Sequence, residues 1–272
     1  MLKETSGLTP ADRVILARQA TRPKATQYID ALFTDFYELH GDRLTGDDKS
    51  ILGGIGFFKS IAVTVIAQCK GTNLDENIKY NFGMSVPAGY RKVLRLAKNA
   101  EKFNRPIITF IDTPGAYPGI EAEEKGQGEA IAQCLALFSS LTVPTIAVII
   151  GEGGSGGALA IALANTVIML ENSVYSILSP EGFASILWKD STRSAEAAAV
   201  MQLTAFDLLN NNIIDFVINE GEGGINENKA LVFKDLDELL FSELTRLLKL
   251  SPAAIKDERY KKFRNMGNFY EG

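Results

Sequence analysis

The chain has 272 residues and a net charge of −5, with 46% hydrophobic and 22% charged residues, which is ordinary for a globular protein. The negative charge argues against general nucleic-acid binding, and the single histidine, His40, excludes any mechanism or metal site that needs two histidines from this chain. Two cysteines, Cys69 and Cys134, are too few for a zinc site or a disulfide framework.

The first seven residues contain no apolar segment, and we therefore expect no secretory signal peptide. The most apolar region, 141–170, is interrupted by Pro144, by the glycine-rich run 151–157 and by Asn165, so it is not expected to cross a membrane. Together with the low cysteine count, these features predict a cytoplasmic protein.

The first third of the chain is expected to contain both helices and strands. Thr9-Pro10-Ala11-Asp12 has the capping residue, the proline and the early acidic residue of a helix start. A second helix is predicted from Ala25 to Leu39, because its apolar residues recur at helical spacing. The next elements are predicted to be a hairpin of strands at 51–58 and 61–69, a polar loop at 70–83 and a helix at 86–103.

The middle of the chain repeats one plan, in which an apolar strand leads into a glycine-containing turn and then a helix. Residues 106–111 lead into Asp112-Thr-Pro-Gly-Ala-Tyr-Pro-Gly119 and a helix to about Ser139. Residues 144–150 lead into Gly151-Glu-Gly-Gly-Ser-Gly-Gly157 and a helix to about Leu163. Apolar strands without alternation are typical of a parallel sheet buried on both faces, and this predicts an α/β fold.

The last third is predicted to be mainly helical, with three short strands. The predicted elements are strands at 166–170, 174–178 and 213–218, helices at 181–188 and 194–203, an exposed polar loop at 219–228 and amphipathic helices at 235–250 and 252–264.

The glycine-rich run 151–157 matches two functional motifs. G-x-S-x-G around Ser155 is typical of a nucleophile elbow, but the hydrolase triad needs a histidine after the serine, and His40 precedes it. G-x-G-x-x-G, with Glu171 20 residues after Gly151, fits the dinucleotide fingerprint of an NAD-dependent dehydrogenase, but leaves the earlier glycine turn unexplained. A third interpretation is a tight turn that needs glycine only for its backbone conformation or for close packing.

A further hypothesis takes both turns together. Gly115-Ala116 and Gly156-Gly157 each place adjacent backbone amides near the start of a predicted helix. Such amides stabilise a developing oxyanion without any titratable side chain, and small residues let a substrate approach them. We therefore expect these residues to form the oxyanion-binding groups of an enzyme.

Several runs along the chain are distinctive in combination. They are Gly41-Asp-Arg43, Asp47-Asp-Lys49, Asn81-Phe-Gly-Met84, Gly89-Tyr-Arg-Lys92, residues 106–119, residues 151–160, Ser179-Pro-Glu-Gly182 and Ala184-Ser-Ile-Leu-Trp188. At these positions the chain resembles the alpha subunit of the bacterial acetyl-CoA carboxylase carboxyltransferase, and the resemblance spans nearly its whole length.

The resemblance implies a fold, an activity and a set of partners. The fold is a crotonase-like (ClpP/crotonase) α/β fold of repeated ββα units, with an N-terminal helical arm (1–24), a carboxyltransferase domain (25–250) and a C-terminal helix and tail (251–272). The activity is transfer of the carboxyl group from carboxybiotin, carried on a biotin carboxyl carrier protein, to acetyl-CoA, which gives malonyl-CoA for fatty acid biosynthesis. The partners are a beta subunit in an α2β2 assembly, the carrier protein and biotin carboxylase, with zinc on the beta subunit only and no metal, membrane or specific nucleic acid for this chain.

The resemblance also implies site residues on the carboxybiotin side of a shared active site. The amides of Gly156 and Gly157 are expected to hold the biotin ureido oxygen, with Gly115 and Ala116 as a second amide pair, and the biotin nitrogen itself takes the methyl proton. Substrate contacts are expected from Gly153, Gly154, Ser155, Tyr117 and Glu181. Lys70, Arg91 and Lys92 are candidates for contacts to the carrier or to CoA phosphates, and the alternative for them is a solvated surface. Two other hypotheses stay open: an NAD-dependent oxidoreductase and a non-catalytic scaffold subunit.

Overall fold

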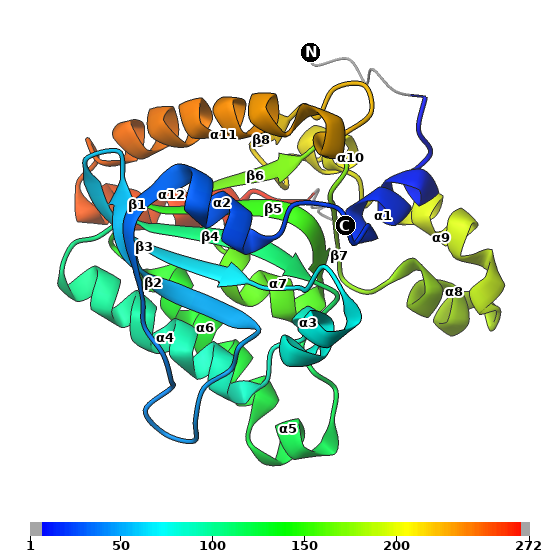
Figure 1. The fold of residues 1–272 in the computed structure, drawn as a ribbon, viewed down its shortest axis with the longest axis horizontal. Helices are drawn as coiled ribbons and strands as arrows, with labels where there is room; N and C mark the ends of the chain where they lie inside the picture. Colours follow the sequence, from blue (N-terminus) through cyan, green and yellow to red (C-terminus); the bar gives the residue numbers. More distant parts are fainter. Residues whose placement is uncertain (1–6, 268–272) are drawn as a thin grey trace, which may run out of the picture.

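The computed structural model describes residues 7–267, so the first six residues of the predicted N-terminal arm and the last five of the predicted tail lie outside the described residues. One sheet runs through the molecule, with helices on both faces (Figure 1). Its strand order is β1 (Phe33–Glu38), β2 (Ile51–Phe58), β3 (Ile61–Gln68), β4 (Ile107–Thr113), β5 (Thr145–Gly154), β6 (Thr166–Leu170) and β8 (Phe216–Ile218), while β7 (Val174–Ser176) pairs with the end of β5. The strands from β3 to β8 are parallel, as the unbroken apolar runs predicted.

Each face of the sheet carries its own apolar core. One face is covered by α4 (Pro87–Lys102), α6 (Gln127–Ser140), α7 (Ser155–Ala162) and α10 (Ala205–Asn210), and the other by α2 (Ala25–Leu32) and α11 (Ile225–Leu247). The central strand β4 is buried along its entire length, because both faces are covered. The predicted helix at 252–264 is confirmed as α12 (Pro252–Arg264), and Arg259 ties it to α6 by donating to the carbonyl of Phe138.

A smaller group of helices packs beside the carboxyl end of β5 (Figure 1). It consists of α1 (Pro10–Arg18), α8 (Pro180–Trp188), a short 3₁₀ helix (Ser191–Arg193) and α9 (Ser194–Met201). The predicted start of α1 is confirmed by a capping box between Thr9 and Asp12. Val14 and Ala17 of α1 pack against Ala198 of α9, so this first helix is held against the body of the protein.

The predicted helix at 25–39 is wrong beyond Leu32. Its second half forms β1, which pairs antiparallel with β2 and contains a register shift where Asp35 takes a φ of +50°. Residues 33–38 are rich in aromatic and β-branched residues, and an available sheet edge decides their conformation where helical spacing alone does not.

Two segments predicted as loops contain helices. In 70–83, α3 (Leu74–Lys79) begins at Asn73, whose side chain accepts the backbone N–H of Glu76, and a 3₁₀ helix (Asn81–Gly83) follows. In 219–228, α11 begins at Ile225, ten residues before the predicted start. The short helix α5 (Ile120–Glu124) also separates from α6, although one helix was expected there.

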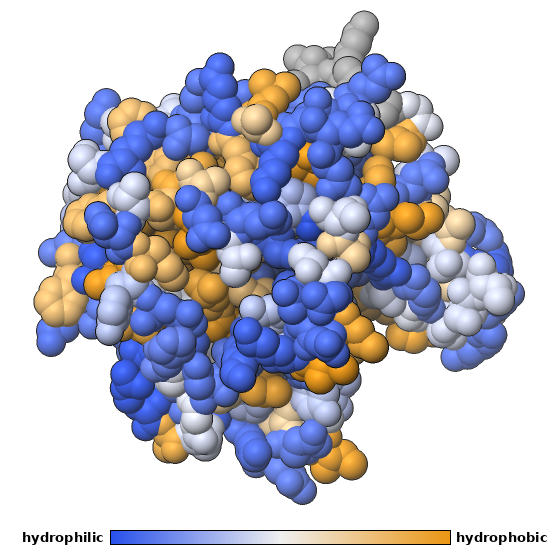
Figure 2. Space-filling model, viewed as in Figure 1, coloured by the Kyte–Doolittle hydropathy of each residue, from blue (hydrophilic) through white to orange (hydrophobic). Residues whose placement is uncertain are grey.

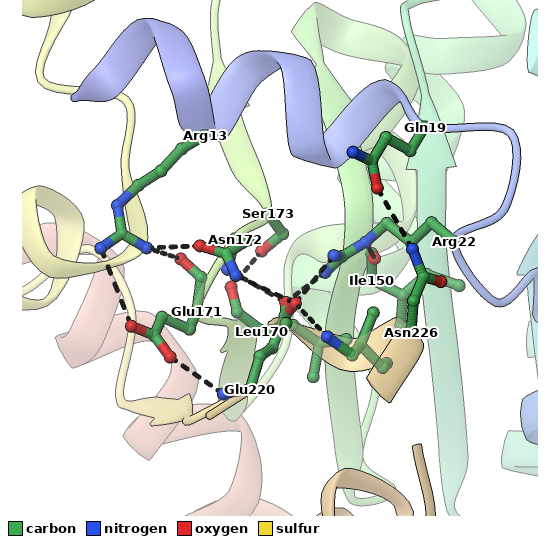
Figure 3. Close-up of polar contacts among 12 residues, drawn as sticks. Arg13, Gln19, Arg22, Ile150, Leu170, Glu171, Asn172, Ser173, Glu220 and Asn226 are labelled. Carbon is green, nitrogen blue, oxygen red and sulfur yellow. Dashed lines mark hydrogen bonds and ion pairs between the residues drawn. The ribbon is translucent and has the colours of Figure 1, made fainter. Parts of the chain in front are cut away.

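The early start of α11 depends on Glu220, which is buried although it lies in a polar run (Figure 3). Its carboxylate pairs with Arg22 at 2.5 Å and accepts the backbone N–H groups of Asn172 and Ile225 at 3.0 and 3.1 Å. Arg13 of α1 donates to Asn172 at 2.7 Å, so this buried network fastens the N-terminal segment to the ends of β6 and β8.

Candidate active site

The turns that follow β4 and β5 are in direct contact. A Cβ atom added to Gly157 would lie 2.6 Å from the backbone nitrogen of Ala116 and 2.7 Å from the carbonyl carbon of Gly115. A Cβ added to Gly154 would lie 2.2 Å from the carbonyl oxygen of Pro114. Glycine is therefore required here because two backbones approach each other, and the structure brings together the two turns that the sequence analysis paired.

The amides in these turns differ in their availability. Helix α7 starts at Ser155 without a side-chain cap, so the amides of Gly156 and Gly157 belong to the first turn, where an α-helix supplies no acceptor. The amide of Gly115 donates to the hydroxyl of Thr113 at 3.0 Å. Within residues 7–267, no hydrogen bond engages the amide of Ala116, so the first predicted pair offers one donor rather than two.

A cavity of about 610 Å³ opens at this end of α7, with Ser155 and Gly156 on its wall. Most of the remaining wall is apolar and comes from α7 to α10, from β7 and from the segments that follow β7 and α10. These residues include Leu159, Tyr175, Ile177, Phe183, Val200 and Met201. Gly153 and Gly154 belong to β5 rather than to the turn, and the ring of Tyr175 lies where a side chain on Gly153 would stand.

A chain of ion pairs lies behind the glycine-rich run. The carboxylate of Asp112 accepts the backbone N–H of Glu152 at 3.1 Å, and Lys70 pairs with both carboxylates, at 2.9 Å to Asp112 and 2.5 Å to Glu152. Burial acts to lower the pKa of Lys70, but the two carboxylates outweigh burial and raise it, so this lysine stays charged. Arg18 of α1 extends the chain by pairing with Glu152 at 2.7 Å.

Of the predicted site residues, only Ser155 and Gly156 line this cavity; Gly153, Gly154, Gly157, Gly115, Ala116, Tyr117 and Glu181 do not. Tyr117 donates its hydroxyl to Glu121 at 2.9 Å. Glu181 pairs with Arg18 at 2.8 Å, and this hydrogen bond is the main reason why the pKa of Glu181 is lowered. Glu181 therefore joins α8 to α1 and, through Arg18, to the glycine-rich run.

The candidate cationic contacts are also paired inside the chain. Lys70 is held as described, Arg91 pairs with Asp42 at 2.9 Å, and Lys92 is fully buried with its ammonium 2.9 Å from Asp47. His40 lies after β1, beside Asp47 at 3.2 Å, and does not line the cavity at Ser155. These side chains hold loops in place.

Neither the apolar wall of the cavity nor the chain of ion pairs was predicted from the sequence. Asp112 had a detectable signal, because it directly follows a buried strand and precedes a glycine turn. Tyr175 and Phe183 had none, because the pairing of β7 with the end of β5 cannot be read from local spacing.

Glu171, the acidic residue required by the dinucleotide hypothesis, is already engaged. It is buried, it accepts the backbone N–H of Glu220 at 2.9 Å, and it lies 3.7 Å from the guanidinium of Arg13 (Figure 3). It is therefore not available for a ribose hydroxyl.

Comparison with known proteins identifies the family. Residues 2–267 match the family described as acetyl co-enzyme A carboxylase carboxyltransferase-like. The chain is 55% identical over 270 residues to the acetyl-coenzyme A carboxylase carboxyl transferase subunit alpha of Clostridium acetobutylicum, which covers 99% of this chain and 98% of that protein. The chain belongs to this family. The corresponding subunit of Geobacillus thermodenitrificans is 52% identical over 262 residues, covering 96% of this chain and 81% of that protein.

Solved structures agree on the fold. A transcarboxylase 12S structure superposes with a TM-score of 0.65 at 18% identity, covering 82% of this chain and 41% of that chain. A Pseudomonas malonate decarboxylase hetero-tetramer in complex with coenzyme A gives a TM-score of 0.66 at 15% identity, covering 79% of this chain and 86% of that chain. At these identities the likeness shows the crotonase-like carboxyltransferase fold alone.

The comparisons confirm the predicted family, fold and activity: the chain is a carboxyltransferase subunit of acetyl-CoA carboxylase, the enzyme that forms malonyl-CoA. The NAD-dependent oxidoreductase hypothesis is wrong. The name alpha subunit implies a beta partner in the same enzyme. No helix within residues 7–267 is long and apolar enough to cross a membrane.

Proposed function

We propose that this chain forms the carboxybiotin side of an active site that it shares with the beta subunit in an α2β2 assembly. The proposal depends on one observation: the two strand-end turns that carry the amides of Ala116, Gly156 and Gly157 are in direct contact, and Gly156 lines an apolar cavity. None of the residues that line this cavity in the described chain is a histidine, lysine, aspartate or glutamate. Negative charge that develops there is therefore stabilised by backbone N–H dipoles rather than by a titrating side chain.

The cavity suits a biotin ring. A volume of about 610 Å³, with flat apolar walls from Tyr175 and Phe183, accommodates a fused bicyclic ring, while its single ureido oxygen needs hydrogen-bond donors at one end. When bound, carboxybiotin supplies the carboxyl group and, through its ureido nitrogen, the acceptor for the methyl proton of acetyl-CoA.

The residues of this chain bind and orient carboxybiotin and exclude water from it. The amides of Gly156 and Gly157 carry the positive end of the α7 dipole and hold the ureido oxygen as it becomes negative, together with the amide of Ala116. The apolar wall removes water, which strengthens these interactions. The ion pairs of Lys70 keep β4 and β5 in the register at which the two turns meet.

Exposed apolar side chains on α3 and α5 indicate a binding surface for a protein partner. On the face shown in Figure 2, apolar residues gather around α3 and α5, where Leu74, Ile78 and Ile120 are all more than 60% exposed. Exposed apolar groups of this kind mark interaction surfaces. We assign this surface to the beta subunit, which we expect to hold zinc and most of the acetyl-CoA.

The remaining partners follow from the same reaction. The biotin carboxyl carrier protein delivers carboxybiotin to the cavity, and biotin carboxylase reloads the carrier in the full complex. We place this complex in the cytoplasm, where malonyl-CoA enters fatty acid biosynthesis. The two buried cysteines, Cys69 and Cys134, are both free thiols, which is compatible with a reducing compartment.

The shared site is tested by omission. The chain, its beta partner and carboxylated biotin are combined with acetyl-CoA, and malonyl-CoA is measured with each subunit left out in turn. We expect product only from the complete mixture. Activity from either subunit alone would overturn the shared site, and activity from the beta subunit alone would favour the scaffold hypothesis.

The role of the amides is tested at Gly156. Proline there removes one N–H that the helix does not use, whereas alanine adds a carbon and keeps the N–H. Alanine fits, because the nearest atom to an added Cβ is Cγ2 of Ile131 at 3.6 Å. We expect Gly156→Pro to lose about 100- to 1000-fold in turnover and Gly156→Ala to stay within a few-fold. Normal turnover in a folded Gly156→Pro complex would overturn the role of this amide.

A further inference from the structure

Ser155 is the one residue of the glycine-rich run with a left-handed backbone. Its φ is +53°, whereas none of the five glycines at 151, 153, 154, 156 and 157 has a positive φ. The usual relation is thus inverted: the glycines take ordinary conformations, and the residue that carries a side chain takes the conformation that glycine would adopt without strain.

Packing does not explain why a serine occupies this position. Ser155 is exposed at the start of α7 and lines the apolar cavity, so a glycine would relieve strain without leaving a hole in the core. A side chain kept in a strained conformation at a site points to use of its functional group.

The hydroxyl of Ser155 is available, in contrast to the other serine on the cavity wall. Ser176 donates its hydroxyl to the carbonyl of Leu178 at 2.7 Å. For Ser155, no hydrogen bond of the side chain is found within residues 7–267, and the residue directly precedes the amide of Gly156. The lining contains no histidine or carboxylate that would take a proton from the hydroxyl, so Ser155 acts as a donor and not as a nucleophile.

We propose that the Ser155 hydroxyl donates a hydrogen bond to the carboxyl group in transit, while the backbone amides hold the ureido oxygen. This inference rests on the proposed function of the cavity. In the transfer, the bond between the carboxyl carbon and the ureido nitrogen breaks, a bond to the acetyl methyl carbon forms, and the methyl proton ends on the nitrogen. Ser155 keeps its own proton throughout and holds the carboxyl group in position between the ureido nitrogen and the acetyl methyl carbon.

The test compares Ser155→Ala with Ser155→Gly in the complex with the beta subunit. Both variants lack the hydroxyl, but only Ser155→Gly relieves the backbone. We expect both to lose about 10- to 100-fold in turnover, the range for one hydrogen bond to a charged group, with the KM for acetyl-CoA unchanged. The melting temperature should rise in Ser155→Gly and stay at or below that of the wild type in Ser155→Ala. Ser140→Ala, which removes an exposed hydroxyl bonded within α6, is the control.

Binding of free biotin, measured by calorimetry, provides a second readout. Free biotin has the ureido group but lacks the carboxyl group in transit, so both variants should bind it within about twofold of the wild type. Wild-type turnover in Ser155→Gly would overturn the proposal, and so would a loss of biotin affinity as large as the loss of turnover. If Gly156→Pro also turns over normally, the proposed function fails; if only Ser155→Gly does, the failure is confined to this serine.

Discussion

Residues 151–157, which span the end of β5 and the start of α7, and residues 221–224, which follow β8, are both glycine-rich, yet their glycines have different structural roles. In the first segment no glycine has a positive φ, and the missing side chains leave room for neighbouring backbone and rings. In the second, Gly221, Gly223 and Gly224 have φ values of +70°, +79° and +72°. Composition therefore does not reveal whether glycine serves close approach or chain reversal, and the two uses have different consequences for substitution.

Both segments are supported by ion pairs, which are partly buried at the first and fully buried at the second, and the N-terminal region supplies an arginine to each. Arg18 pairs with Glu152 in the first segment, and Arg22 pairs with Glu220 beside the second. The first set of pairs lies behind the start of α7, where Gly156 lines a cavity, whereas the carboxylate of Glu220 accepts the backbone N–H of Ile225 at the start of α11. We therefore expect damage at the first segment to reduce transfer and damage at the second to reduce stability alone.

The largest effect on turnover is expected from Gly157→Ala. Its methyl group would stand 2.6 Å from the backbone nitrogen of Ala116, so both turns must move apart. We expect turnover to fall by at least about 100-fold and the free energy of unfolding to fall by about 2–3 kcal/mol. Steady-state assays and urea unfolding of the complex measure the two effects.

Gly156→Ala is the matched control for Gly157→Ala, because its added carbon meets only a side-chain methyl at 3.6 Å. It should retain most activity and stability. Equal turnover in the two variants would contradict the close approach of the turns as the reason for Gly157.

The next largest effect on turnover is expected from Lys70→Met. The substitution leaves Asp112 and Glu152 facing each other without their shared cation. Removing one partner of a buried ion pair costs about 3–5 kcal/mol of unfolding free energy, and loss of register between the turns should lower turnover about tenfold. Lys59→Met, which breaks a more exposed pair with Asp237, should cost less than about 1 kcal/mol. Similar losses in both variants would show that the charges behind the glycine-rich run have no special role.

The sequence predicted the parts of this fold that depend on local pattern. The unbroken apolar runs 106–111 and 144–150 indicated the parallel sheet, and the turns that follow them were correctly located. The prediction for segment 33–38 was wrong, because a helix and a strand both fit its residues and only pairing with β2 decides between them. The cavity wall was not predicted for a similar reason, since only tertiary packing brings Tyr175 and Phe183 to the site. Glu220 shows the same limit, as a carboxylate in a polar run is buried only because Arg22, almost two hundred residues earlier, meets it.

At the second segment, Glu220→Gln should reduce stability and leave turnover of the folded complex unchanged. Burial opposes ionisation of Glu220, but Arg22 outweighs burial, and the pKa lies below its ordinary value. A lowered pKa in the folded state means that this stability is present above about pH 4.3, the ordinary value for glutamate, and is lost as the pH falls through the folded pKa. The difference in unfolding free energy between wild type and Glu220→Gln should therefore be about 3 kcal/mol at neutral pH and shrink in acid. Glu222→Gln in the exposed part of the loop is the control, and a difference that does not change with pH would contradict an ionised Glu220.

The smallest effect is expected from Gly223→Ala. With a φ of +79°, an alanine there is strained, and an added Cβ also meets the carboxylate of Glu227, which is exposed and can move away. We expect a loss of about 1 kcal/mol in unfolding free energy and no change in transfer. Gly223→Asn should lose less, because asparagine tolerates the left-handed conformation better than alanine. This ranking identifies the cause as backbone conformation, since a cost set by crowding would be larger for the bulkier asparagine. At Gly157, where crowding sets the cost, asparagine should be at least as damaging as alanine, so the two substitutions applied at both glycines separate the two uses of glycine in one experiment.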